Sequence, residues 1–185
     1  MDILIILINP EFAYWRRNMS LYIVTILMNR ISNDASSIQS PLILIREKFL
    51  MGSITAFPTV HGQGLAGMLM RPGAGYFIEL AGDKTIYISG DTVMTQTVRH
   101  VLKDLRPDIS ILNAGTAALD FGKPILMPIN EQLDFIRAAP GIVIAVHLEA
   151  FNHCLTNRDM LKNAVSKAGL SGKVMIPADG ELMEL

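Results

Sequence analysis

Short apolar runs separated by turn residues dominate the chain from about residue 46 onward. Runs of this kind are typical of buried strands, whereas apolar residues that recur at helical spacing are typical of amphipathic helices. The pattern predicts strands over Ser53–Val60, Tyr76–Leu80, Lys84–Ser89, Asp108–Asn113, Ile142–Val146 and Val174–Ile176, and the start of a further strand over Leu42–Ile45.

Three segments between these strands carry the apolar spacing of helices. Thr92–Leu105 is the first of them, and Pro107 ends it. Asn130–Ala138 follows a proline that opens the second helix. The third begins near Thr156, an N-cap residue type with an acid three positions later, and ends at Gly169, which suits the C-cap.

The order of the elements favours a layered α/β or α+β domain. An Ala-Gly-Asp loop at residues 81–83 joins two expected strands as a hairpin, and the later strands alternate with helices. Hairpins and β-α-β units together indicate a mixed sheet covered by helices. We place this domain at residues 46–185.

Residues 1–45 have a different pattern and are left unassigned. Two apolar runs, Ile3–Ile8 and Leu21–Met28, precede a polar stretch over Ser32–Ser40. Both runs are far shorter than the roughly 18 to 20 residues that cross a bilayer. No basic segment precedes the first run, which Pro10 ends, so we expect neither a signal peptide nor a membrane partner.

Composition narrows the class of protein further. Of the 185 residues 50% are hydrophobic, and the formal net charge is −1, so a packed core is expected. The chain has no block of Lys and Arg of the kind that neutralises many phosphates, which disfavours a nucleic-acid partner. Cys154 is the single cysteine; it excludes an internal disulfide framework and fits a cytoplasmic location.

Three residues of metal-ligating type come directly after expected strands. His61 follows SITAFPTV, Asp91 follows TIYISG, and His147 follows IVIAV. Side chains just past strand ends converge when the strands end at one edge of a sheet. Two imidazoles with a carboxylate suit zinc, manganese or iron. The alternative is that the histidines are hydrogen-bonded loop residues and that Asp91 is a turn or N-cap residue.

Two further segments lie near these candidates in the sequence. The glycine-rich span after His61 contains GQGLAG, but a hairpin pattern follows it where dinucleotide binding needs a helix, so we interpret it as a turning loop. Asn152 and His153 are candidates for the mouth of a pocket.

The ordered motifs SITAFPTVHG, TIYISGDT, DISILNAG, IVIAVHLEAFNHC and MIPADGE resemble the second half of metallo-β-lactamase-fold metal-dependent hydrolases. The resemblance implies an αββα sandwich with one or two metal ions, zinc by preference, at one edge of its sheets. It implies that His61 and His147 are metal ligands and that Asp91 is the bridging ligand and catalytic carboxylate. A metal-bound hydroxide in this family attacks an ester, lactone, amide or phosphoester.

The chain departs from this family in its first half. Its signature H-x-H-x-D-H is not present, because no histidine precedes His61. Three hypotheses follow: a truncated metal-dependent hydrolase, a non-catalytic remnant or interaction module, and a half-enzyme completed by a partner chain. A half-fold also leaves one sheet face to be covered, either by Ile3–Ile8 and Leu21–Met28 or by a second chain, as in a homo-oligomer. The substrate is expected to be a small molecule.

Overall fold

The computed structural model describes residues 45–49, 52–62, 73–117, 125–149 and 155–183. The chain divides into two units, of which Ser40–Ile176 is one and Met1–Gln39 with Pro177–Leu185 the other. The first unit holds every helix and strand of the described residues. Several segments named above lie outside the described part of the chain. They are the two apolar runs of the first 45 residues, Leu42–Leu44, the part of GQGLAG beyond Gly62, and Asn152, His153 and Cys154.

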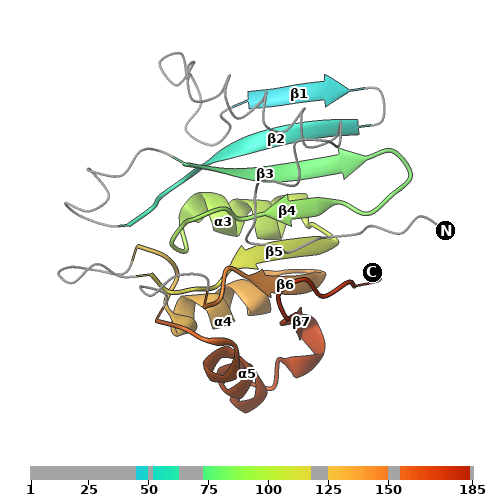
Figure 1. The fold of residues 1–185 in the computed structure, drawn as a ribbon. Helices are drawn as coiled ribbons and strands as arrows, with labels where there is room; N and C mark the ends of the chain where they lie inside the picture. Colours follow the sequence, from blue (N-terminus) through green and yellow to red (C-terminus); the bar gives the residue numbers. More distant parts are fainter. Residues whose placement is uncertain (1–44, 50–51, 63–72, 118–124, 150–154, 184–185) are drawn as a thin grey trace. The chain divides into compact units, whose positions relative to one another are not determined.

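The described strands form one seven-stranded mixed sheet whose spatial order follows the chain (Figure 1). The first four strands pair antiparallel and the last four pair parallel. The carboxyl ends of β2, β4, β5 and β6 therefore lie along the same edge, at the left of Figure 1. The strands are β1 (Ile45–Phe49), β2 (Gly52–Thr59), β3 (Gly73–Leu80), β4 (Ile86–Ile88), β5 (Ile109–Asn113), β6 (Ile142–Val146) and β7 (Val174–Met175).

Helices pack on one face of this sheet and bury its main core. Phe57, Phe77 and Tyr87 of neighbouring strands join one hydrophobic cluster with side chains from four helical segments. Tyr87 stacks on Phe135 with ring centroids 6.3 Å apart, which fixes one helix over the middle of the sheet. The segments are α3 (Gln96–His100), its π-helical continuation η2 (Val101–Leu105), α4 (Ile129–Ala138) and α5 (Arg158–Lys167); a short 3₁₀ turn, η3 (Ser171–Lys173), precedes β7.

The predicted mixed α/β architecture is confirmed, and so are the hairpin and the six strands of the domain, with ends shifted by a few residues. The helix expected from Thr92 begins only at Gln96, because Thr95 is the N-cap and its side chain accepts from Val98 N. The N-cap of α5 is Asn157 rather than Thr156. Gly169 has the predicted left-handed conformation, with φ of 69°.

The sheet face opposite the helices carries a row of isoleucines. The strand register places Ile54, Ile78, Ile86, Ile109 and Ile142 side by side across five strands. Since alternate residues of a strand point to opposite faces, this row belongs to the face away from the main core. An apolar face here agrees with the expectation that a second layer packs on it. In the described part of the chain, no helix is both long and apolar enough to cross a membrane.

Candidate functional site

The three predicted ligands follow strands that end at the same edge of the sheet. His61 comes two residues after β2, Asp91 three residues after β4, and His147 directly after β6. All three are partly buried. The strand directions therefore bring to one edge residues that the sequence separates widely, as the pattern predicted (Figure 1).

Backbone and side-chain hydrogen bonds join the end of β2 to the loop after β4, although β3 lies between these strands. Val60 N donates to Thr92 Oγ1 at 3.1 Å, and Val93 N donates to Val60 O at 3.0 Å. Thr92 is buried, so water does not compete for its hydroxyl. These two hydrogen bonds hold Val60, the residue before His61, against Thr92 and Val93, which follow Asp91.

Gly73 at the start of β3 and Gly90 in the loop after β4 make this close approach possible. A Cβ at Gly90 would lie 2.6 Å from Ala74 O, and one at Gly73 would lie 2.6 Å from Thr59 Oγ1. Gly90 also has a φ of 62°, a left-handed conformation that glycine adopts without steric cost. Part of the glycine-rich span after His61 thus has a structural role: it lets the chain segments at this edge converge.

The carboxylate of Asp91 is held by a residue that the sequence analysis did not single out. Asn113, the last residue of β5, donates from Nδ2 to Asp91 Oδ1 at 2.7 Å. Its own backbone N donates to Ser89 Oγ at 3.3 Å. The strand segment DISILN also contains the polar residues Asp108 and Ser110, so the sequence alone does not distinguish Asn113.

His147 has a conformation that is unfavourable for a residue with a side chain. Its φ is 59°, and that of Glu149 two positions later is 61°. Left-handed non-glycine residues cost about 1–3 kcal/mol and concentrate at functional sites. Leu148 between them is buried in the core, and the Glu149 carboxylate accepts from Arg158 N at 2.9 Å and from Arg158 Nη1 at 2.6 Å. The buried Leu148 side chain and the Glu149–Arg158 contacts hold the backbone around His147 in this conformation.

The same contacts lower the pKa of the Glu149 carboxyl below its ordinary value. The backbone N–H of Arg158 is the largest cause, followed by the hydrogen bond and the charge of its guanidinium. Glu149 therefore stays ionised and acts as an anchor for the start of α5. It is a structural neighbour of His147 rather than a proton donor at neutral pH.

A buried polar network lies behind the edge. Gln132 of α4 is fully buried, and its Nε2 donates to Ala114 O, to Thr116 Oγ1 and to Met127 O at 2.7–2.9 Å. Thr156 Oγ1 donates to Thr116 Oγ1 at 2.6 Å. These bonds tie the loop after β5 to α4 and to the segment before α5. Only the apolar periodicity of α4 was predicted; a buried glutamine inside it has no sequence signal.

The residue types at the edge fit a metal, but the described residues do not form a complete set of ligands. Imidazole nitrogens and a carboxylate are suitable donors for zinc, manganese or iron. Within the described ranges, no group of three or more His, Cys, Asp or Glu side chains is close enough together to hold an ion. His61, Asp91 and His147 thus fit as contributors to a metal centre, and not as all of it.

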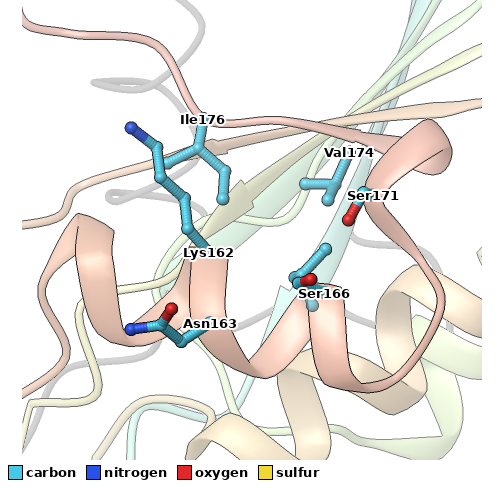
Figure 2. A pocket seen from close by; sticks show the side chains of 7 residues that line it. Lys162, Asn163, Ser166, Ser171, Val174 and Ile176 are labelled. Atoms are coloured by element: carbon cyan, nitrogen blue, oxygen red, sulfur yellow. The ribbon is translucent and has the colours of Figure 1, made fainter.

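A separate open groove of about 390 Å³ lies between α5, η3 and β7 (Figure 2). Val165, Val174 and Ile176 form its apolar part, and Lys162, Asn163, Ser166 and Ser171 complete the lining. None of the three candidate ligands lines it, and neither does any other side chain of metal-ligating type. The groove is therefore not part of the candidate metal site.

Comparison with known proteins adds one curated relative. It is the UPF0173 protein YddR of Bacillus subtilis (strain 168), which is 32% identical over 124 residues. The match covers 65% of this chain and 48% of YddR, so the chain spans about half the length of that relative. No protein-family model matches the chain.

Three solved structures show the same arrangement of elements. Isothiocyanate hydrolase from Delia radicum gut bacteria has a TM-score of 0.71 at 30% identity, over 80% of this chain and 59% of its own. A possible metal-dependent hydrolase from Veillonella parvula has a TM-score of 0.70 at 26% identity, and the match covers 76% of this chain and 56% of that protein. YhfI from Bacillus subtilis, a metallo-β-lactamase-fold protein, has a TM-score of 0.56 at 20% identity, and the match covers 78% of this chain and 54% of YhfI.

Proposed function

We propose that the chain is a member of the superfamily of proteins with the metallo-β-lactamase fold and that it contributes part of the metal centre of a metal-dependent hydrolase. His61, Asp91 and His147 are the contributed ligands. The remaining ligands come from a polypeptide segment with the H-x-H-x-D-H motif, which the 185 residues lack. The observation that carries the proposal is that β2, β4 and β6 end at the same edge of the sheet, each followed by a ligand-type side chain.

The need for outside ligands follows from coordination chemistry. A catalytic zinc normally keeps three protein ligands and an open position for water or substrate. The edge offers two imidazoles and one carboxylate, which the described structure does not gather into one group. If two ions are bound, Asp91 lies between His61 and His147 and each histidine serves a different ion. Each ion then depends on donors that the second segment carries.

The residues of this chain have distinct roles in the proposed centre. When bound, the metal supplies Lewis acidity and a nucleophilic hydroxide. Asp91 would supply a carboxylate at the middle of the edge, and His147 would supply an imidazole from a backbone position with a φ of 59°. Zinc is the expected ion, with manganese and iron as alternatives.

The substrate is expected to be a small molecule with a polarised electrophilic centre. An ester, lactone, amide or phosphoester fits the chemistry of a metal-bound hydroxide. An isothiocyanate is a further candidate, because the solved isothiocyanate hydrolase is 30% identical to this chain. The single cysteine, Cys154, supports a cytoplasmic setting.

A non-catalytic interaction module is the second candidate function. The lack of a close group of three ligands among the described residues favours it, together with the apolar isoleucine row on the sheet. In that case the edge has lost its metal, and the sheet face remains as the functional surface. The two functions differ in one measurable property, which is hydrolysis that depends on His61, Asp91 and His147.

The test compares the purified chain alone with the chain co-expressed with an H-x-H-x-D-H segment from a metallo-β-lactamase-fold relative. Hydrolysis of 4-nitrophenyl acetate, a lactone, bis(4-nitrophenyl) phosphate and allyl isothiocyanate is measured with Zn²⁺. We expect activity in the complex only, and its loss in Asp91→Ala and His147→Ala. His100→Ala is the matched control, because His100 pairs with Asp104 on the exposed side of a helix. A stable complex without activity on any of these substrates would favour the interaction module.

A further inference from the structure

Asn113 has a contact that neither the sequence pattern nor the list of candidate ligands explains. It is the last residue of β5, and the strand register pairs it with Val146, the residue before His147. Its side-chain amide donates to Asp91 Oδ1 at 2.7 Å. Asn113 therefore lies between the loop that carries Asp91 and the strand end that carries His147.

The backbone that presents this amide is fixed by the sheet. Asn113 N donates to Ser89 Oγ at 3.3 Å, and Ala114 N donates to Val146 O at 2.9 Å. Ser89 N in turn donates to Ile111 O at 2.9 Å. A donor on such a strand end has a defined position, whereas a donor on a flexible loop would follow the carboxylate wherever it moved.

The type of donor is as informative as its position. An amide N–H orients a carboxylate without cancelling its charge, whereas an Arg or Lys partner would form an ion pair that competes with a cation. None of the ion pairs found among the described residues involves Asp91. The contact thus directs one carboxylate oxygen toward Asn113 and preserves the negative charge of Asp91.

We propose that Asn113 is a positioning residue that orients the Asp91 carboxylate for metal binding. The inference rests on the proposed function. Partners of this kind, which hydrogen-bond to a ligand and not to the ion, typically change metal affinity about 10–100-fold when they are removed. A purely structural role predicts a different result: loss of the amide would lower the stability of the fold and leave metal affinity unchanged.

The test uses Co²⁺ as the probe, because its visible absorption reports the geometry of its ligands. The chain in complex with the co-expressed H-x-H-x-D-H segment is titrated as wild type and as Asn113→Leu, which keeps the size of the side chain and removes the donor. We expect about 10–100-fold weaker Co²⁺ binding and a changed absorption spectrum. Asn163→Leu, an exposed asparagine on α5, is the matched control and retains wild-type binding. Asn113→Ala is the second variant if the leucine prevents folding.

The outcomes separate this inference from the proposed function. If Asp91→Ala and His61→Ala weaken Co²⁺ binding but both Asn113 variants bind as wild type does, the role of Asn113 is wrong and the metal site stands. If Co²⁺ binding is insensitive to His61 and Asp91, the proposed function is wrong and the role of Asn113 falls with it. Thermal unfolding of each variant, measured without metal, shows whether the fold is intact.

Discussion

The two edges of the sheet each carry an aspartate next to a strand, and the two aspartates have different surroundings. Asp108 precedes β5 at the edge formed by the amino ends of the parallel strands. Its Oδ2 accepts from Thr85 N and from Thr85 Oγ1, both at 2.8 Å, and its own N donates to Thr85 Oγ1 at 3.0 Å. Asp91 lies at the opposite edge and accepts one hydrogen bond, from Asn113, among those found in the described residues.

The hydrogen bonding of the backbone differs between the edges, whereas strained residues occur near both. At the Asp108 edge the bonds are reciprocal, and Ile142 N donates to Asp108 O at 3.0 Å to continue the ladder. Arg106, two residues before Asp108, has a left-handed conformation, as His147 and Glu149 have at the Asp91 edge. Reciprocal hydrogen bonding around a carboxylate is typical of a structural cap, whereas a strained residue of ligand type that is held by core anchors is typical of functional sites. The comparison assigns structure to one edge and chemistry to the other.

Leu148 is the anchor on which the Asp91 edge depends most. It is 2% exposed and packs in the main core between two strained residues. Leu148→Ala should lower the free energy of unfolding by about 2–5 kcal/mol, because it leaves a cavity under His147. Denaturant unfolding measures the loss. Leu155→Ala is the control, since Leu155 is 59% exposed and should cost less than about 0.5 kcal/mol. Equal costs for the two variants would show that the edge is not anchored there.

Substitution of the two aspartates separates a structural role from a chemical one. Asp108→Ala removes an acceptor for both donors of Thr85 and should cost about 1 kcal/mol in the free energy of unfolding. Asp91→Ala should cost less than about 0.5 kcal/mol, since a single partly buried hydrogen bond is lost. Thermal unfolding compares them. A larger loss for Asp91→Ala would make Asp91 the structural cap.

Relief of backbone strain at His147 should stabilise the protein while it removes a ligand. His147→Gly should raise the free energy of unfolding by about 0.5–1 kcal/mol, because glycine adopts a positive φ without steric cost. Arg106→Gly is the matched control, with a φ of 53° at the end of η2. Both variants should gain stability, and only His147→Gly should lose Zn²⁺ binding. A loss of stability in His147→Gly alone would mean that its imidazole has a structural contact that outweighs the strain.

The smallest expected effect is a pH dependence at the Asp108 edge. The backbone N–H of Thr85, and then its hydroxyl, lower the pKa of the Asp108 carboxyl in the folded state. A lowered folded-state pKa adds stability above the unfolded-state pKa of about 3.9, and that stability is lost as the pH falls through the folded-state pKa. The advantage of wild type over Asp108→Ala should therefore be constant above about pH 5 and shrink on acidification. Thermal midpoints of both proteins across this range measure it, and an advantage that grows at low pH would contradict the assignment.

Local patterns predicted most of the fold because each strand is short, apolar and bounded by turn residues. The start of the helix at Gln96 was not predicted, because Thr95 is its N-cap and Thr92 instead bonds to Val60, a residue 32 positions away. The π-helical turn over Val101–Leu105 was not predicted either. The conformation of the strand ends was not predicted either, because it depends on contacts such as that of Gly90 with Ala74, between residues far apart in the sequence.

The candidate site was predictable as a recurrence of ligand types after strands, and not as a network. His61, Asp91 and His147 were predicted in this way and stay a prediction, and their place at one edge follows from the strand directions. Asn113 and Gln132 were missed, because an amide at a strand end or inside a helix has no distinctive spacing. Their importance appears only when the hydrogen-bond partners are known.

The central claim is that the edge with His61, Asp91 and His147 contributes metal ligands. Titration with Zn²⁺ of the ¹⁵N-labelled chain in complex with the unlabelled H-x-H-x-D-H segment, followed by the imidazole ring nitrogen signals of the labelled chain, tests it most directly. We predict that the signals of His61 and His147 shift and saturate, that Asp91→Ala weakens both responses, and that His100, which is paired with Asp104, does not respond. Equal responses from His100 and the two edge histidines, or no response from His61 and His147, would contradict the account.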